Sequence, residues 1–163
     1  MVTQRLSSRE GHRRKFLAVI DDTPECERAV NYAARRAEGT NGGLILLYVI
    51  EPGDFQHWLG VEEVMREEAV AKGEETVARY AQMARDSAGI ESEVVVREGK
   101  AIEQIHQLIE DDQEIAIMVL AASAAKEGPG PLVSSVAGRG AAFPIPVTVV
   151  PANLSDEDIA LIA

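Results

Sequence analysis

The chain has 163 residues, of which 46% are hydrophobic and 26% charged, values typical of one soluble globular domain. Its formal net charge is -11 at pH 7, so nucleic acid and anionic membrane surfaces would repel it, and we expect neither as a partner. The single cysteine, Cys26, cannot form an internal disulfide, which favours a cytoplasmic location. No apolar run is long enough for a membrane-spanning helix or a signal-peptide core.

The first predicted elements follow a basic segment without periodicity, residues 1–13, where we expect a flexible N-terminal tail. Residues 16–20 form a continuous apolar run that ends at Asp21, which is typical of a parallel strand buried on both faces. Thr23 is expected to cap the next helix, which stops at Gly39. The buried face of that helix would contain Cys26, Ala29, Val30, Ala33 and Ala37.

Residues 44–50 are also fully apolar and predict the second strand. His57 and Trp58 lie in the irregular segment after it, where Trp58 would either cover the edge of the core or line a pocket. Between residues 61 and 88, apolar side chains recur at three- and four-residue steps, which indicates the longest helix, with Gly89 as its C-cap.

The second half continues the alternation of strands and helices. Residues 90–97, 115–121 and 147–150 predict three further strands, a short helix lies between the first two, and another helix is expected to start at Ser134. Residues 152–163 predict an acidic tail or short helix. This order predicts an α/β fold with an open five-stranded parallel sheet and helices on both faces. Expected core residues are Val19, Leu46, Val95, Val119 and Val149.

Little in the sequence points to catalysis or to a metal. The three histidines lie far apart, and no carboxylate or cysteine spacing completes a metal site. Cys26 is expected on a buried helix face, and Ser123, Ser134 and Ser135 have no histidine near them in the chain. We therefore expect no enzyme activity and no metal. Ligands of open α/β sheets bind beyond the carboxyl ends of the strands, which here is the loop after residue 121.

The ordered set of features resembles the universal stress protein family over about residues 14–151. Asp21 closes the first strand, Val49 lies at the end of the second, and a loop of small residues leads from the fourth strand to Ser134 and Ser135. The resemblance implies strand order 3-2-1-4-5, a dimer and, in one branch of the family, bound ATP. In that branch, Asp21 would match the acidic residue that lies at the base and ribose of the nucleotide. Val49 would match the hydrophobic residue that contacts adenine. An acidic residue after the first strand can also simply cap the following helix. Asp21 can therefore be interpreted either as a nucleotide contact or as a helix cap.

ATP-binding members share a G-x2-G-x9-G-[S/T] motif after the fourth strand. Its three glycine positions fall on Ala121, Ala124 and Ser134, and only the hydroxyl position, Ser135, is retained. If the loop needs left-handed backbone, each alanine costs roughly 1–2 kcal/mol, and two prolines in the loop remove amide donors. We expect phosphate binding roughly 30- to 1000-fold weaker than in a glycine-bearing relative, so no cofactor, with ATP or AMP bound weakly at most.

Three functions remain open. The first is a dimeric, non-enzymatic stress-response or signalling module acting through a protein partner. The second is an ATP- or AMP-binding switch, or a very slow ATPase, using Asp21, Val49 and Ser135. The third is a phospho-acceptor receiver domain, suggested by the acidic pair Asp21 and Asp22 but opposed by the absence of a phosphorylatable Asp after the third strand and of a Lys after the fifth.

A homodimer is expected through the strand at Val147, Thr148, Val149 and Val150, because an edge strand rich in β-branched residues and free of charge invites pairing. In the competing arrangement, residues 153–163 fold back over that edge and keep the chain monomeric.

Overall fold

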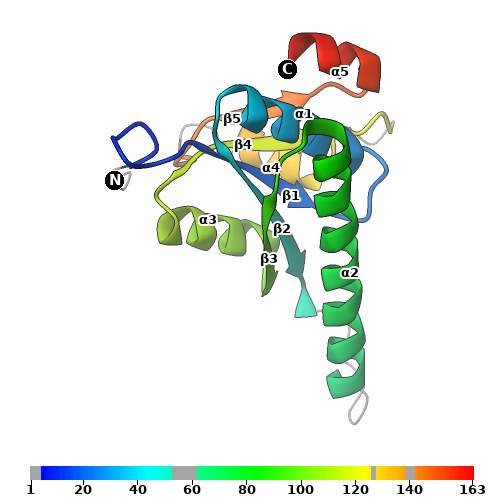
Figure 1. Cartoon of the computed structure of the whole chain (residues 1–163). Helices are drawn as coiled ribbons and strands as arrows, with labels where there is room; N and C mark the ends of the chain where they lie inside the picture. Colours follow the sequence, from blue (N-terminus) through cyan, green and yellow to red (C-terminus); the bar gives the residue numbers. More distant parts are fainter. Residues whose placement is uncertain (1–4, 53–61, 126–127, 139–141) are drawn as a thin grey trace.

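The computed structural model describes residues 5–52, 62–125, 128–138 and 142–163. Its elements are β1 Lys15–Ile20, α1 Cys26–Gly39, β2 Gly43–Ile50, α2 Glu62–Ala88, β3 Ser92–Glu98, α3 Ala101–Asp111, β4 Ile115–Ala121, α4 Pro131–Gly138, β5 Val147–Val150 and α5 Asp156–Ile162. All strand pairs are parallel, in the order β3-β2-β1-β4-β5, which confirms the predicted topology (Figure 1). His57 and Trp58 lie outside the described residues.

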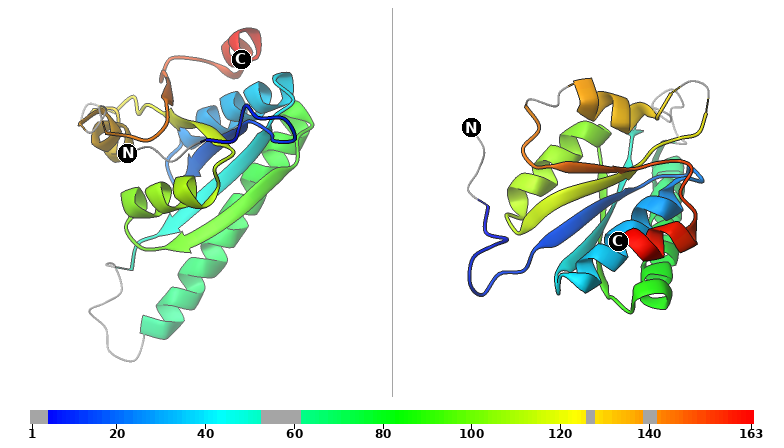
Figure 2. Two further views of the ribbon diagram at one scale, coloured as in Figure 1. Left: turned by 90° about the vertical axis from the view of Figure 1, so that its left-hand side faces the viewer. Right: turned by 90° about the horizontal axis from the view of Figure 1, so that it is seen from above.

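The sheet separates two hydrophobic cores. Helices lie on both faces of the sheet (Figure 2). Phe16 and Ala18 of β1 pack towards α1 and α2, whereas Leu17 and Val19 pack towards α3 and α4, and all four are buried. Because both faces of the central strands are covered by helices, these strands need apolar residues at every position. This explains why the sequence runs are continuous rather than alternating.

The expected core residues divide according to their distance from the sheet centre. Val19, Leu46 and Val119 are buried as predicted. Val95 of β3 is half-buried against the core on the α3 and α4 side. The prediction for Val149 is wrong, because its side chain is 40% exposed. It lies on β5, an edge strand with a neighbour on one side only.

Two helix starts also differ from the sequence-based expectation. The helix α1 begins at Cys26 without a side-chain cap, and the Thr23 hydroxyl, expected to cap it, instead donates a hydrogen bond to the Asp21 carboxylate. The helix α4 begins at Pro131 rather than at Ser134. Proline suits the first helical position because its fixed φ is already helical and no helical partner exists there for an N–H.

Gly42, in the turn between α1 and β2, is the glycine whose substitution should cost most. An added Cβ would overlap the backbone carbonyl oxygen of Arg14, which cannot rotate away and which accepts the N–H of Gly43. Gly42→Ala is expected to lower the free energy of unfolding by about 2–4 kcal/mol. Urea denaturation measures it, with Gly39→Ala as control, since a Cβ there meets nothing within 4 Å. Equal stability of the two variants would contradict the proposed overlap.

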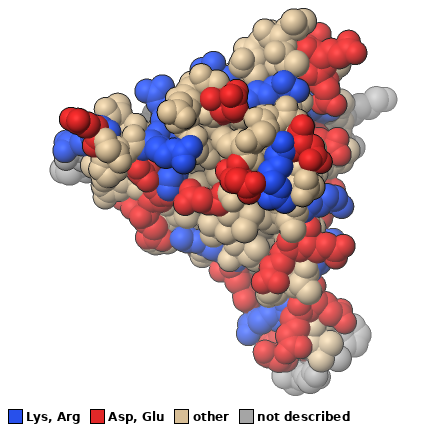
Figure 3. Space-filling view, in the orientation of Figure 1, with Lys and Arg blue, Asp and Glu red and all other residues tan. Residues whose placement is uncertain are grey.

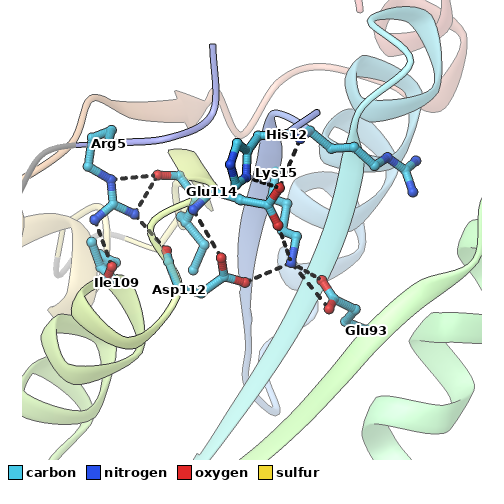
Figure 4. Close-up of polar contacts among 9 residues, drawn as sticks. Arg5, His12, Lys15, Glu93, Ile109, Asp112 and Glu114 are labelled. Carbon is cyan, nitrogen blue, oxygen red and sulfur yellow. Dashed lines mark hydrogen bonds and ion pairs between the residues drawn. The ribbon is translucent and has the colours of Figure 1, made fainter. Parts of the chain in front are cut away.

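Residues 5–14 lie at the amino-terminal ends of the strands, although the sequence suggested a flexible tail. The Arg5 guanidinium donates hydrogen bonds to the carbonyl oxygens of Ile109 at 2.8 Å, Asp112 at 2.7 Å and Ile115 at 2.8 Å (Figure 4). These carbonyl groups belong to the last turn of α3, to the residue that follows it and to the first residue of β4. The Arg5 side chain therefore caps the carboxyl-terminal end of α3. A guanidinium from a distant segment thus replaces the missing helical donors.

Lys15, the first residue of β1, joins three carboxylates at the same edge. Its ammonium lies 2.8 Å from Asp112, 3.0 Å from Glu93 and 3.3 Å from Glu114 (Figure 4). Burial works against its charged form, but the bonds to Asp112 and Glu93 outweigh burial and raise the pKa of Lys15. The backbone N–H of Arg13 donates to Glu114 and is the main cause that lowers the pKa of that carboxyl. The cluster therefore ties β1, β3 and the α3–β4 turn together, at the end of the sheet opposite the crevice.

Candidate ligand crevice

A small cavity of about 60 Å³ lies beyond the carboxyl ends of β1 and β4, where the sequence placed the candidate site. A water molecule accounts for about 30 Å³ of liquid, and small-molecule pockets have roughly 300–1000 Å³. The cavity therefore has room for waters but not for a nucleotide without movement of its walls. Described lining residues are Val19, Asp21, Thr23, Glu25, Cys26, Ala29, Leu120, Ala121, Pro129, Gly130, Pro131, Leu132 and Val133.

One wall is the turn between β1 and α1, which carries negative charge. The Asp21 carboxylate accepts hydrogen bonds from the backbone N–H of Thr23 at 3.0 Å and from the Thr23 hydroxyl. Glu25 supplies a second carboxylate, and no Lys or Arg is among the described residues that line the cavity. Two carboxylates without a cation make this wall unfavourable for a phosphate group.

Cys26, in the first turn of α1, also lines the cavity. Its side chain is 3% exposed, and burial raises the pKa of the thiol to about 12. The reactive form of cysteine is the thiolate, so at neutral pH this group stays protonated and behaves as a small apolar side chain. This agrees with the sequence-based expectation that Cys26 is part of the core.

The opposite wall is the loop between β4 and α4, whose amide hydrogens are largely used within the protein. The N–H of Ala122 donates to the last carbonyl oxygen of β5 at 2.9 Å, that of Ser123 to Pro129 at 3.0 Å, and that of Gly128 to Ala125 at 3.2 Å. A phosphate cradle needs free amide hydrogens directed at the ligand. These three amides are instead directed at the loop itself and at β5.

The loop backbone also avoids the strain that the sequence suggested. Gly128 and Gly130 have φ of 117° and 108°, whereas neither Ala121 nor Ala124 has a positive φ. The expected cost of left-handed alanines is therefore not incurred, because the two glycines take up the left-handed positions at other places in the loop. The missing glycines change the path of the loop rather than strain it.

The structure brings together only two of the six residues predicted for a nucleotide site. Asp21 and Ala121 line the cavity, whereas Val49 packs against the core beside α3 and α4. Ala124 and Ser134 are exposed, Ser135 is half-buried on α4, and none of the three lines the cavity. The sequence reading missed the role of Thr23, which the Asp-x-Thr spacing after a strand could have indicated as a side-chain turn.

Asp22 faces away from Asp21 and belongs to a second cavity, of about 350 Å³, beside α2. There its carboxylate accepts a hydrogen bond from the Tyr48 hydroxyl at 3.2 Å and lies 3.4 Å from the Lys72 ammonium. Both residues follow the last residue of β1 and line different cavities, so the structure does not direct the two carboxylates at one magnesium site. This argues against the receiver-domain reading. Within the described ranges, no group of three or more His, Cys, Asp or Glu side chains suits a metal.

The surface carries charges of both signs (Figure 3). Acidic side chains gather over the first turns of α2, which extend past the ends of the strands and include Glu62, Glu63, Glu67 and Glu68. None of the helices in the described part of the chain is long and apolar enough to cross a membrane.

A parallel sheet of this order, with a crevice at the ends of its two central strands, defines the class of doubly wound α/β domains that commonly bind nucleotides. The model of the universal stress protein family matches residues 12–151, and the chain belongs to this family. This confirms the resemblance seen in the sequence. No curated protein sequence is significantly similar to the chain.

Solved structures share the fold at low sequence identity. The universal stress protein UspA from Lactobacillus plantarum matches with a TM-score of 0.69 and 19% identity, covering 86% of this chain and 99% of that protein. A universal stress protein family protein from Arabidopsis thaliana with AMP bound matches with a TM-score of 0.59 and 18% identity, covering 90% of this chain and 97% of that protein. The universal stress protein from Archaeoglobus fulgidus in complex with dAMP matches with a TM-score of 0.59 and 15% identity, covering 92% of this chain and 99% of that protein.

Proposed function

We propose that this protein is a dimeric, non-enzymatic stress-response or signalling module that acts through a protein partner and does not hold ATP tightly. The observation that carries the proposal is the crevice between β1 and β4. It has about 60 Å³ of space and two carboxylates in its lining. The loop amides of Ala122, Ser123 and Gly128 are bonded within the protein. The protonated state of Cys26 further supports a role without nucleophilic catalysis.

The dimer is supported by the state of the β5 edge. Val149 is 40% exposed, and beside it lies an apolar groove of about 310 Å³ between β5 and α4. The competing arrangement, in which residues 153–163 cover this edge, is disfavoured because α5 packs mainly against α1. An uncharged edge strand next to an apolar groove is suited to pair with a second copy.

An adenine-nucleotide switch is the second candidate. It is favoured by relatives whose structures contain AMP, dAMP or cAMP. A monophosphate needs fewer amide donors than a triphosphate, so it would tolerate this loop better than ATP. Binding would require the β4–α4 loop to move outward from Asp21.

Calorimetric titration distinguishes the two functions. Mg-ATP is expected to bind with a dissociation constant above about 100 μM, because several loop amides are bonded within the protein and no Lys or Arg is among the described residues that line the crevice. Low-micromolar binding, or ATP retained through purification, would contradict the proposal. Micromolar AMP binding with weak ATP binding would favour the switch.

Measurement of phosphate release from ATP tests the expected lack of catalysis, and light scattering at micromolar concentration tests the dimer.

A further inference from the structure

The C-terminal helix α5 lies beyond residue 151, where the match to the family model ends. It is firmly built into this chain. Ser155 and Asp158 form a reciprocal capping box, and the Asn31 amide of α1 donates to Asp156 at 3.3 Å. Ile159 is fully buried in the core shared with α1. The helix is thus an addition to the matched domain that is held against α1 at a fixed place.

On its outer side, α5 leaves two large apolar side chains in water. Leu161 is 85% exposed and Ile162 is 58% exposed. With Val149 of β5, they make up three of the five exposed large hydrophobic residues among those that the structure describes, the others being Val64 and Val94. Figures 1 and 2 place α5 on the same side of the molecule as the β5 edge. The helix that carries Leu161 and Ile162 therefore lies on the side of the molecule where the proposed dimer would form, on the α1 face of the sheet. Val149 lines the groove on the α4 face of the same edge.

The symmetry of that dimer determines what faces α5. Antiparallel neighbours in one sheet are related by a two-fold axis perpendicular to the sheet, so the same face of both copies lies on the same side. Since α5 lies on the α1 face beside the β5 edge, the two copies of α5 would flank the axis together. The acidic residues of α5 do not oppose this, because they form its first turn and Leu161 and Ile162 its last.

We infer that α5 of one copy contacts α5 of the second copy through Leu161 and Ile162, as a second contact of the dimer beside the β5 pair. This inference rests on the proposed dimer. It assigns the two exposed side chains a partner of matching apolar chemistry and makes residues beyond the family match part of the interface.

Sedimentation equilibrium of the wild type, a double serine variant, Val64→Ser and Val149→Lys tests the inference. The double variant Leu161→Ser with Ile162→Ser is expected to raise the dimer dissociation constant roughly 100-fold, because each dimer loses four apolar side chains from its interface. Ile159, which holds α5 in place, is unchanged. Val64→Ser is the control, since Val64 is 53% exposed on α2, outside the proposed interface, and should leave the constant unchanged.

The outcomes separate the inference from the dimer itself. A wild-type monomer would overturn both. A wild-type dimer that Val149→Lys dissociates, but that the double serine variant leaves at the wild-type constant, would overturn only the contact between the helices. Should the serine variant lose its fold, Leu161→Cys treated with a short bis-maleimide gives a second measurement. Covalent dimer is expected for it and not for Val64→Cys, and its absence in a dimeric sample would overturn the contact.

Discussion

A remodelled β4–α4 loop is expected to raise the affinity for Mg-ATP roughly 30- to 1000-fold, if glycine returns at residues 121, 124 and 134 and serine replaces Pro129 and Pro131. In the present loop, the amide hydrogens of Ala122, Ser123 and Gly128 are bonded to carbonyl oxygens of the loop itself and of β5. Glycines at the family positions would permit the left-handed backbone that a cradle uses, and the serines would restore two amide donors. Calorimetry with Mg-ATP on the five-residue variant and on the wild type measures the difference.

Ser135 provides the matched control for this gain. In the remodelled loop, Ser135→Ala should lower the affinity again by roughly tenfold, because one hydroxyl contact to phosphate is lost. The same change in the wild type should have no measurable effect, since Ser135 does not line the cavity. If the remodelled loop gains no affinity, the carboxylates of Asp21 and Glu25 rather than the loop would be the main obstacle.

Val149→Lys is expected to convert the dimer into a monomer and to raise the dissociation constant by roughly 1000-fold or more. A lysine at this position would place two like charges close to the two-fold axis and remove them from water without a partner. Light scattering over a range of micromolar concentrations measures the change. The stability of the monomer should hardly alter, because the side chain is already 40% exposed.

Val94→Lys is the corresponding control on the other edge strand. Val94 is 54% exposed on β3, so the substitution adds the same charge at a comparable position on the opposite edge of the sheet. It should leave the dimer intact. Dissociation by both variants would indicate a general effect of charge, and dissociation by Val94→Lys alone would place the interface at β3.

Local signals in the sequence were sufficient for much of the fold. The bounds of β4 and β5 match the predicted strands, because a short apolar run between turn residues has few alternatives to a buried strand. The short helix that residues 152–163 allowed forms over Asp156–Ile162, because Ser155 and Asp158 make a capping box, which is a local signal. The parallel direction of the strands followed from their alternation with helices, since a connection between parallel strands usually contains a helix.

Tertiary structure alone decided which groups meet at the crevice and at the edges. Whether the amides of the β4–α4 loop face a ligand or the loop itself depends on how that loop closes, and Ser123 bonds to Pro129 across six positions. Arg5 finds its carbonyl partners more than a hundred residues away, so no local pattern could place it. Val149 looked like a core residue by its type, but the place of β5 at the edge of the sheet exposes it. Composition and periodicity determine which segments become strands and helices, whereas long-range packing determines which surfaces and donors remain free.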